Sequence, residues 1–416
     1  MNVILADILT IGDEILYGQV VDTNSAWMGT ELAKIGIKVR QITSISDNPE
    51  HIIQALNAIS SQSDLILITG GLGPTKDDLT KHTLCRYFNT QLVLDEPSLA
   101  HLTDMFRSRG RELTELNRQQ AFLPAACKPI ANPMGTAPGM WFEQDETIFI
   151  SLPGVPFEMK RIMTDTVLPR LRERYQLVPI QHRVIQTIGI GESFLADQLE
   201  DWENNLPPNL KLAYLPYLAG VRLRLTGVDN GHDEVNQQLD TEQVRLQALI
   251  QDHIFGFGEI SLEQAVGDLL KQKGFTIATA ESCTGGHVAH KLTSPAGSSE
   301  YFMGSVVAYH NHVKIRQLEI SPEDLARHGA VSEQVVCQMA ANVRRLLQTD
   351  IGIATSGIAG PGGGSADKPV GTVWIAYADA EKTVAKKIFY DKERLLNIEY
   401  TTYSVLNLVR QQLIKA

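Results

Sequence analysis

Short apolar runs alternate with segments of helical periodicity along the first part of the chain. The runs VILADILTIG, IKVRQITSI, DLILITGG and ETIFISLPG predict β-strands, because each is largely apolar and short. Helices are predicted near 24–35, 50–60, 78–87, 96–109 and 156–173, the last of them ending near Pro169. This alternation is typical of a parallel sheet covered by helices on both faces, with ligands bound in loops at the carboxyl ends of the strands.

The pattern changes near residue 177 and returns after residue 257. HRVIQTIGI, a helix over 192–202, the alternating stretch LKLAYLPYLAGVRLRLTG and a long helix over 232–250 predict a small α+β module. Beyond it TIATAES, GSVVAYH, DIGIATSG, GTVWIAYA and TVAKKIFY again predict strands between helices. The predicted fold class is α/β. Two three-layer α/β/α domains, residues 1–170 and 258–416, are joined by an α+β module, residues 171–257, that serves as a spacer or for dimerisation.

Composition and charge narrow the class of protein. Hydrophobic residues make up 43% of the chain and charged residues 20%, which is typical of a globular protein and excludes a disordered chain. Charged residues interrupt every apolar run before the ~20 residues that span a bilayer. The first run lacks a basic segment before it and predicts a first strand, not a signal peptide, so a cytoplasmic location is expected. The four cysteines lie far apart and are expected to be reduced.

The charge balance argues against nucleic-acid binding. The formal net charge is −11, and the middle module has seven Lys or Arg against twelve Asp or Glu. Proteins that bind phosphate backbones normally present a basic face. Small anionic ligands remain possible, because a glycine-rich loop or a helix N-terminus can hold a phosphate whatever the global charge.

The segment TIATAESCTGGHVAHKL carries the first candidate chemistry. It predicts a strand that ends at Glu281 and a helix that begins near Gly285, with Gly285 and Gly286 allowing the tight bend between them. Ser282 at this bend faces the open edge of the sheet, beside helix N–H groups that can hold an oxyanion. The alternative is that Ser282 or Thr284 caps the helix, and this segment alone favours the cap.

A nucleophilic serine needs a base, and GSVVAYHNHVK offers one at the end of a neighbouring strand. Lys314 can serve if burial lowers its pKa by about 3 units, and Tyr309 can relay the proton. Asn311 lies in the same polar turn. Taken alone, the pattern favours Lys314 as a solvated surface lysine.

The glycine-rich stretch TSGIAGPGGGSADKPVGTVW supplies a third element. Its backbone can approach a ligand closely, and Ser356 and Gly357 resemble a phosphate or ribose cradle, with Gly360 in the loop beyond. A flexible surface loop is the alternative.

The N-terminal domain has a constellation of its own. TIGDEILYGQVVDTN and ITGGLGPTKDDLT place acidic residues and glycines after strands, and NPMGTAPGM and LPGVPFEMK can close over the same crevice. Glycines cradle phosphate, and Asp77 and Asp78 can bind a hard cation, although acids in the first turn of a helix are the alternative. The expected ligand-binding residues are Glu14, Asn24, Thr69, Gly70, Gly71, Gly73, Thr75, Asp78, Thr80, Asn132 and Gly135, with Asp77 and Asp78 as metal ligands.

The C-terminal motifs resemble those of a known family. AESCTGG, AYHNHVK, the AGSS of SPAGSSEYF, GAVSEQV and SGIAGPGGGSADKPVGTVW, in this order and spacing, are similar to the C-terminal domain of the CinA (competence/damage-inducible protein A) family, whose members include nicotinamide mononucleotide deamidases. The resemblance implies Ser282 as the nucleophile, activated by Lys314 and Tyr309, and an arginine near the substrate at Arg394, with Asn397 one turn on. The N–H groups from Thr284 to Gly286 would stabilise the oxyanion, no cofactor is needed, and Cys283 is the rival nucleophile.

The N-terminal motifs resemble the molybdopterin-binding-like domain of the same family, and GIGES resembles its KH-like middle module, so the resemblance covers essentially the whole chain. In some members the first domain resembles an ADP-ribose pyrophosphatase that uses a divalent cation, Mg²⁺ or Co²⁺, with K⁺ a further candidate. The implied protein is a bifunctional hydrolase of pyridine-nucleotide salvage. Its partners are nicotinamide mononucleotide and ADP-ribose, with neither nucleic acid nor membrane, and it is a homodimer. A non-catalytic regulatory protein that binds molybdopterin or a nucleotide is the alternative, and a third possibility is that only the C-terminal half is active.

Overall fold

The computed structural model describes residues 4–75, 78–177, 180–228 and 234–415. The chain forms two compact units, Met1–Gln181 with Val228–Val235, and His182–Gly227 with Asn236–Ala416. No helix within the described ranges has the length and apolar character to cross a membrane.

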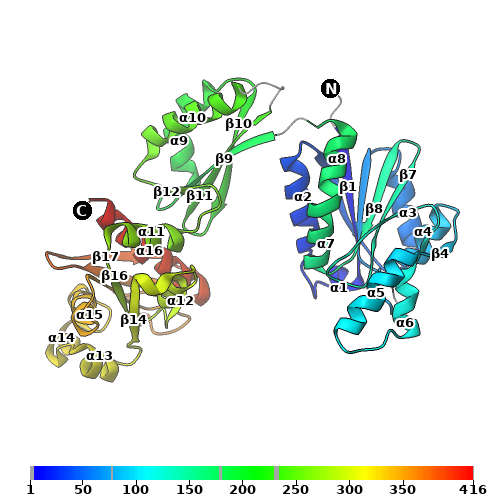
Figure 1. The fold of residues 1–416 in the computed structure, drawn as a ribbon. Coiled ribbons are helices and arrows are strands. Elements are labelled where there is room, and N and C mark those ends of the chain that lie inside the picture. Colours follow the sequence, from blue (N-terminus) through cyan, green and yellow to red (C-terminus); the bar gives the residue numbers. More distant parts are fainter. Residues whose placement is uncertain (1–3, 76–77, 178–179, 229–233, 416) are drawn as a thin grey trace. The chain divides into compact units, whose positions relative to one another are not determined.

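The first unit is built on a six-stranded sheet with the strand order β2-β1-β3-β8-β7-β6 (Figure 1). Its strands are β1 (Leu5–Ile11), β2 (Lys38–Ile45), β3 (Leu65–Thr69), β6 (Lys128–Ile130), β7 (Gly139–Gln144) and β8 (Thr147–Leu152). The strands β2, β1, β3 and β8 are parallel to one another, whereas β7 is antiparallel to both of its neighbours, β8 and β6. The expectation of a parallel sheet was therefore too simple, because a short hairpin between β7 and β8 adds an antiparallel edge without a crossover helix.

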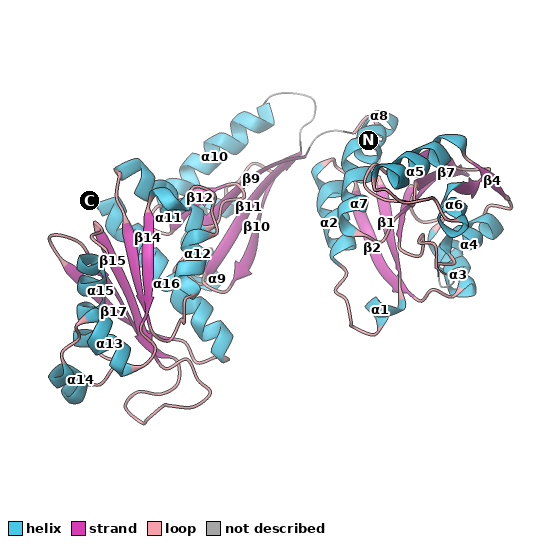
Figure 2. Cartoon of the chain, turned by 60° about the horizontal axis from the view of Figure 1, so that its bottom comes forward, coloured by secondary structure: helices cyan, strands magenta, loops and turns pink. Residues whose placement is uncertain are grey.

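Helices cover both faces of this sheet (Figures 1 and 2). Buried side chains of α2 (Thr23–Lys34), α7 (Pro156–Ile162) and α8 (Leu168–Tyr175) form one core against the sheet. Those of α3 (Pro49–Ile59) and α4 (Thr80–Tyr87) form a second core on the opposite face. The remaining elements are α1 (Asp13–Leu16), β4 (Leu92–Leu94), α5 (Glu96–Ser108), α6 (Glu115–Arg118), η1 (Gln119–Ala121) and β5 (Phe122–Pro124).

The last helix of this unit does not end at its proline. A π-helical turn, η2 (Met163–Val167), separates α7 from α8, and Pro169 lies in the first turn of α8, which continues to Tyr175. A proline lacks the N–H that a helix interior uses, but the π-helical turn directly before α8 interrupts the regular hydrogen-bond ladder where Pro169 enters. The predicted end near Pro169 was wrong for this reason.

The second unit begins with the small α+β module. Its sheet has the order β10-β11-β9-β12 and is covered by two helices. The elements are β9 (Ile180–Thr187), α9 (Glu192–Asn204), β10 (Leu210–Tyr217), β11 (Gly220–Val228), α10 (Glu234–Ile250) and β12 (Ile254–Phe257). The alternating stretch forms the antiparallel hairpin of β10 and β11.

The rest of the second unit is a three-layer domain with the strand order β14-β13-β15-β16-β17. Its strands are β13 (Ile277–Glu281), β14 (Phe302–Val307), β15 (Ile351–Gly357), β16 (Thr372–Ala378) and β17 (Thr383–Phe389). Its helices are α11 (Leu262–Lys273), α12 (His287–Thr293), η3 (Ser298–Glu300), α13 (Asn311–Leu318), α14 (Pro322–His328), α15 (Glu333–Leu346) and α16 (Arg394–Lys415). β13 is parallel to β14 and β15, and the last two strands are antiparallel.

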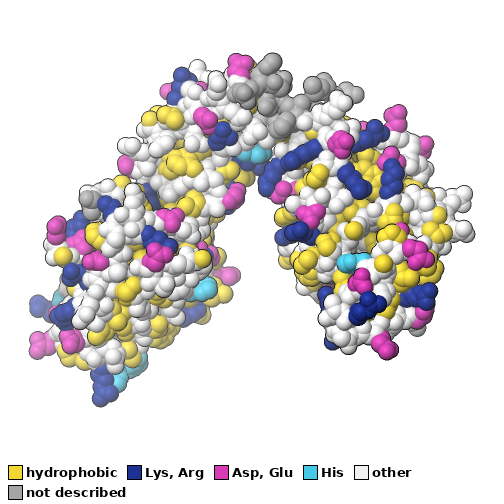
Figure 3. Space-filling view, viewed as in Figure 1, with side chains coloured by type: hydrophobic (Ala, Val, Ile, Leu, Met, Phe, Trp, Pro, Cys, Tyr) yellow, Lys and Arg dark blue, Asp and Glu magenta, His cyan; other side chains and the backbone are white. Residues whose placement is uncertain are grey.

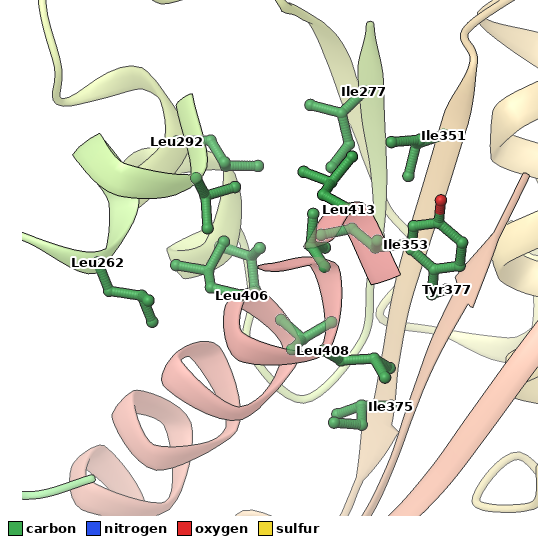
Figure 4. Packing of buried hydrophobic residues seen from close by; sticks show 14 of the residues in the cluster. Leu262, Ile277, Leu292, Ile351, Ile353, Ile375, Tyr377, Leu406, Leu408 and Leu413 are labelled. Carbon is green, nitrogen blue, oxygen red and sulfur yellow. The ribbon is translucent and has the colours of Figure 1, made fainter. Parts of the chain in front are cut away.

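Two apolar cores hold this domain together. Leu262 of α11, Leu292 of α12 and Leu406 of α16 pack against one face of the sheet (Figure 4). Met339 and other buried residues of α15 pack against the other face. Figure 3 shows acidic and basic side chains interspersed with hydrophobic ones on the visible surface of both units.

Candidate active site

The carboxyl ends of β13, β14 and β15 meet at one edge of the C-terminal sheet. β13 lies between the other two strands, so the chain leaves it at the point where the strand order reverses, which is where open α/β sheets bind ligands. A pocket of about 310 Å³ opens there. It is lined by Ser282, Cys283, Tyr309, Asn311, Lys314, Ala330, Val331, Ser356, Gly357, Ile358, Ala359, Gly360, Gly362, Gly363 and Arg394.

A serine and a lysine are in contact in this pocket. The Nζ of Lys314 lies 3.0 Å from the Oγ of Ser282 and 2.7 Å from the carbonyl oxygen of Ala308. Lys314 is 1% exposed, because the segment predicted as a polar turn is the helix α13, which starts at Asn311 and turns this side chain inward. Burial lowers the pKa of Lys314 to about 8. The local expectation of a solvated lysine was wrong.

Tyr309 and Arg394 form the rim of the pocket. Tyr309 is well exposed, and its hydroxyl accepts a hydrogen bond from Nη2 of Arg394 at 2.8 Å. Nη1 of Arg394 donates to the carbonyl of Gly360 at 2.6 Å. The Tyr309 hydroxyl thus contacts the arginine and not the Ser282–Lys314 pair, although its main-chain carbonyl lies 3.4 Å from the Lys314 Nζ.

The rival nucleophile is chemically poor. Cys283 lines the pocket, but it is buried, and burial raises the pKa of its thiol to about 12, with the carboxylate of Glu281 acting in the same direction. A thiol reacts as its thiolate, so Cys283 is inert near neutral pH. The structure favours Ser282.

The glycine-rich loop is anchored at several points. The amide of Asn397, in the first turns of α16, donates to the carbonyl of Ala359 at 3.0 Å and to that of Lys392 at 2.8 Å. Ser356 is buried and its hydroxyl donates to the carbonyl of Ala330 at 2.7 Å, so this hydroxyl holds the pocket wall. Gly357 and Gly360 present their backbones to the cavity.

The turn after Ser282 differs from the sequence expectation. α12 begins at His287, and Gly286 caps it with a left-handed φ of 103°. The Gly285 N–H donates to the carbonyl of Ser282, and the Gly286 N–H donates to the carboxylate of Glu281. Both N–H groups are therefore occupied and cannot stabilise an oxyanion. Sequence reasoning missed Glu281, although a carboxylate that ends a buried apolar strand was a signal.

The first unit has a crevice of about 400 Å³ at the carboxyl ends of β1, β3 and β8. Of the expected residues it is lined by Glu14, Asn24, Thr69, Gly70, Gly71, Gly73 and Asp78. Gly70 has a φ of 110°, and a Cβ there would collide with the main chain of Ile11, so this position requires glycine. Asp22, which caps the start of α2, and Asp47, in the loop between β2 and α3, also line the crevice and were missed, although acidic residues just before predicted helices were a signal.

Four expected residues lie away from the crevice lining. Thr75 hydrogen bonds to the Asp78 carboxylate, and Thr80 is buried behind Gly71. Asn132 and Gly135 line a separate pocket of about 300 Å³ beside α5. Their loop is held there because the Asn132 amide donates to the Glu158 carboxylate. Asp77 lies outside the described residues.

Carboxylates dominate the electrostatics of the crevice. Burial raises the pKa of Asp47, and the neighbouring carboxylates of Asp13, Glu14 and Asp78 act in the same direction against a hydrogen bond from the Asp13 N–H. The described lining contains no lysine or arginine. Oδ1 of Asn24 is buried without a partner. These oxygens suit a hard cation, although no three His, Cys, Asp or Glu side chains in the described part of the chain converge on one metal position.

Comparison with known proteins identifies the family. The model for the CinA C-terminal domain matches residues 259–413, the one for a probable molybdopterin binding domain matches 7–173, and the one for the damage-inducible protein CinA KH domain matches 182–256. A CinA-like protein of Cytophaga hutchinsonii is 50% identical over 410 residues, 99% of this chain and 98% of the relative. The chain belongs to the CinA family.

A second full-length relative and a solved structure are also similar to this chain. A CinA-like protein of Flavobacterium psychrophilum is 44% identical over 412 residues, 99% of each chain. The crystal structure of a CinA superfamily protein from Klebsiella pneumoniae is 31% identical and covers 37% of this chain and 97% of that chain, with a TM-score of 0.37. The fold class predicted for this CinA chain, two α/β domains with a KH-like module between them, is confirmed.

Proposed function

We propose that the C-terminal domain of this CinA chain is an amidase that hydrolyses nicotinamide mononucleotide to nicotinate mononucleotide and ammonia. The observation that carries the proposal is the buried amine of Lys314, 3.0 Å from the Ser282 hydroxyl in a pocket at the strand ends. A hydroxyl of this kind becomes a nucleophile when a base of suitable pKa lies within hydrogen-bond reach. The substrate class follows from the family resemblance of the motifs.

The surroundings of Lys314 suit a base. A neutral amine has two hydrogens and one lone pair. The carbonyls of Ala308 and Tyr309 lie 2.7 and 3.4 Å from Nζ and accept the hydrogens. The lone pair is then free to accept the Ser282 proton. The causes of the lowered pKa, burial first, include no neighbouring carboxylate that would hold Lys314 in its charged form.

The reaction follows from this pair. Ser282 Oγ attacks the carboxamide carbon as its proton moves to Lys314, giving a tetrahedral oxyanion. Lys314 returns the proton to the leaving nitrogen, the C–N bond breaks, and ammonia leaves an acyl ester on Ser282. Water then attacks the ester with Lys314 again acting as the base, which releases the carboxylic acid and restores the hydroxyl. Arg394 at the rim would meet the anionic part of a nucleotide in this reaction.

The test is ammonia release from nicotinamide mononucleotide by the purified chain. We expect Ser282→Ala to lower kcat by at least ~1000-fold, whereas Cys283→Ala keeps kcat within about threefold of wild type. Absence of ammonia release by wild type, or release unchanged in Ser282→Ala, rejects the amidase. Equilibrium binding of the nucleotide without turnover would favour a binding or regulatory role.

The crevice of the first unit supports a second activity, hydrolysis of ADP-ribose to AMP and ribose 5-phosphate. Its glycine turns leave room for a diphosphate, but its carboxylates would repel that group. No Lys or Arg of the described lining offsets this repulsion. A divalent cation resolves this conflict, because Mg²⁺ is commonly held by one or two carboxylates together with substrate phosphates. One or two of the lining carboxylates Glu14, Asp47 and Asp78 would hold it together with the substrate phosphates, and it would neutralise the diphosphate.

Binding measurements test this cation requirement separately from turnover. We expect ADP-ribose to bind the full chain in calorimetry with Mg²⁺ and at least ~10-fold more weakly with EDTA, and Asp47→Asn to weaken the Mg²⁺-dependent binding. AMP formation then reports hydrolysis. Equal affinity with and without the cation would contradict the assignment of these carboxylates.

A further inference from the structure

A buried carboxylate lies directly before the serine. Glu281 is fully buried at the end of β13, and its carboxylate accepts hydrogen bonds from the main-chain N–H groups of Gly286, Val288 and Ala289 at 2.9, 3.1 and 2.8 Å. The hydroxyl of Thr284 donates to the same carboxylate at 2.7 Å. Neither the hydrogen bonds nor the ion pairs of the described residues give Glu281 a cationic partner. The N–H groups at the start of α12 instead stabilise its carboxylate by hydrogen bonds.

The main chain around Glu281 is anchored on both sides. Its carbonyl accepts from the N–H of Ala308, next to β14, and the following N–H, that of Ser282, donates to the carbonyl of Thr355 in β15. The side chain of Glu281 then reaches over the turn and holds the start of α12. The five residues from Ser282 to Gly286 are thus spanned by one side chain whose own backbone is fixed in the sheet.

This arrangement decides which N–H groups remain for an oxyanion. Those of Ser282, Gly285 and Gly286 have acceptors within the protein, and so have those of His287, Val288 and Ala289. Among the described residues of this turn, the N–H groups of Cys283 and Thr284 have no hydrogen-bond acceptor in another residue. Cys283 also lines the pocket. The N–H groups directly after the nucleophile are therefore the ones available.

We propose that Glu281 is a positioning residue of the amidase, which shapes the turn so that the N–H groups of Cys283 and Thr284 face the oxyanion while Ser282 stays against Lys314. This inference rests on the proposed function. Glu281 does not touch the substrate. Its carboxylate binds the N–H groups of Gly286, Val288 and Ala289 and so fixes the conformation of the turn. The N–H groups of the turn that would stabilise the oxyanion are then held in place before the substrate binds.

The test compares Glu281→Gln with Glu263→Gln in the full chain. Glu263 is also a mostly buried carboxylate of this domain, but it pairs with Lys291 on the helix flank. A glutamine amide offers one acceptor oxygen in place of two, so the three N–H groups cannot all be satisfied. We expect Glu281→Gln to lower kcat on nicotinamide mononucleotide by ~100-fold with KM changed less than about threefold, and Glu263→Gln to keep both.

A second readout does not depend on the substrate. Pyridine-3-boronic acid can form a tetrahedral adduct with a serine hydroxyl and so probes the oxyanion site directly. We expect ¹¹B NMR to show the adduct in wild type and Glu263→Gln, and an affinity at least ~10-fold weaker in Glu281→Gln, while the affinity for nicotinate mononucleotide changes little. Should wild type bind the boronate but release no ammonia, the substrate assignment fails. The boronate affinities of the two variants still decide the role of Glu281 in that case.

Two outcomes would overturn the inference. One is a folded Glu281→Gln variant with wild-type kcat and boronate affinity. The other is an equal loss of boronate and product affinity together with a lowered melting temperature, which is what a merely structural role produces. If Glu281→Gln does not fold, Thr284→Val removes a single donor to the carboxylate, and it must shift kcat and boronate affinity in the same direction by a smaller factor, about 3- to 10-fold. An unchanged Thr284→Val variant would then contradict the proposal.

Discussion

At the scale of single residues, the proposed amidase reaction depends on whether the Lys314 amine is neutral. Burial lowers its pKa to about 8, from an ordinary value of 10.5, because a charged amine loses its hydration inside the protein. The two carbonyl oxygens at its Nζ compensate this loss only in part. The pKa of Lys314 thus lies near the range in which a base is partly unprotonated at neutral pH and still strong enough to take a proton from serine.

The pH profile follows from this pKa. The neutral amine is the active form, so kcat/KM should rise with pH and level off above about 8, with a slope near one below it. Lys314→Arg keeps the charge and cannot lose its proton, and we expect at least ~1000-fold lower kcat at every pH. Initial rates of ammonia release between pH 6 and 10 measure both. A flat profile across this range would exclude Lys314 as the titrating base.

The same pKa has a consequence for stability. Between about 8 and 10.5 the unfolded lysine binds a proton that the folded one has lost, so this group makes folding more favourable as the pH rises through that window. Replacing it by methionine removes this contribution. We expect the methionine variant to gain more stability relative to wild type at pH 7 than at pH 10. Urea denaturation of Lys314→Met and wild type at both pH values measures the difference in the free energy of unfolding. Equal differences at the two pH values would count against the lowered pKa.

At the scale of elements, the glycine-rich loop depends on the first turns of α16. Asn397 is buried, and it joins Ala359 in the loop to Lys392 before the helix. The loop itself contains several glycines and cannot hold one conformation unaided. Arg394, one turn earlier, holds Gly360 in the same way. The loop geometry is therefore set by the helix.

Asn397→Ala should loosen the loop. The variant leaves the Ala359 and Lys392 carbonyls unsatisfied in a buried setting, and we expect a loss of about 2 to 3 kcal/mol in the free energy of unfolding together with a higher KM. Asn204→Ala is the matched control, since that side chain is exposed and makes no hydrogen bond among the described residues. Urea denaturation and initial-rate kinetics provide the comparison. A variant with wild-type stability and KM would show that the loop is held by other contacts.

At the scale of the whole molecule, the KH-like module and the C-terminal domain form one unit. Arg410 of α16 is 2% exposed, and its guanidinium donates to the carbonyls of Ile254 and Asp252 at 2.8 and 2.7 Å. Ile188 of the module also belongs to the core of the C-terminal domain. The helix α16 therefore holds the glycine-rich loop of the pocket with its first turns and contacts the KH-like module farther along, at Arg410.

Arg410→Met should weaken this attachment. Two buried carbonyls lose their donors, and we expect the second unit to lose about 2 to 4 kcal/mol of stability. Arg316→Met, at an exposed position without an ion pair among the described residues, should change the stability by less than about 0.5 kcal/mol. Differential scanning calorimetry of the full chain measures both. Equal melting temperatures and unfolding enthalpies in the two variants would contradict a structural role for Arg410.

The sequence by itself determined the layers of the two domains and one half of the candidate site. Buried strands give continuous apolar runs, and this local signal placed β1, β3 and β13 and therefore also Ser282 and Gly70 at strand ends. The antiparallel edge of the first sheet was not predicted, since apolar runs such as those of β7 and β8 do not indicate strand direction. The family motifs named the residues of the pocket in advance.

Tertiary structure alone decided what those residues can do. Lys314 is buried and basic because β14 pairs with β13, which brings together side chains 32 positions apart. The carboxylate of Glu281 accepts hydrogen bonds from N–H groups of α12 because main-chain hydrogen bonds within the sheet fix the backbone of Glu281 beside that helix. Periodicity reports which face of an element is apolar. Contact, burial and pKa depend on strand order and register, and these are set by packing between segments far apart in the chain.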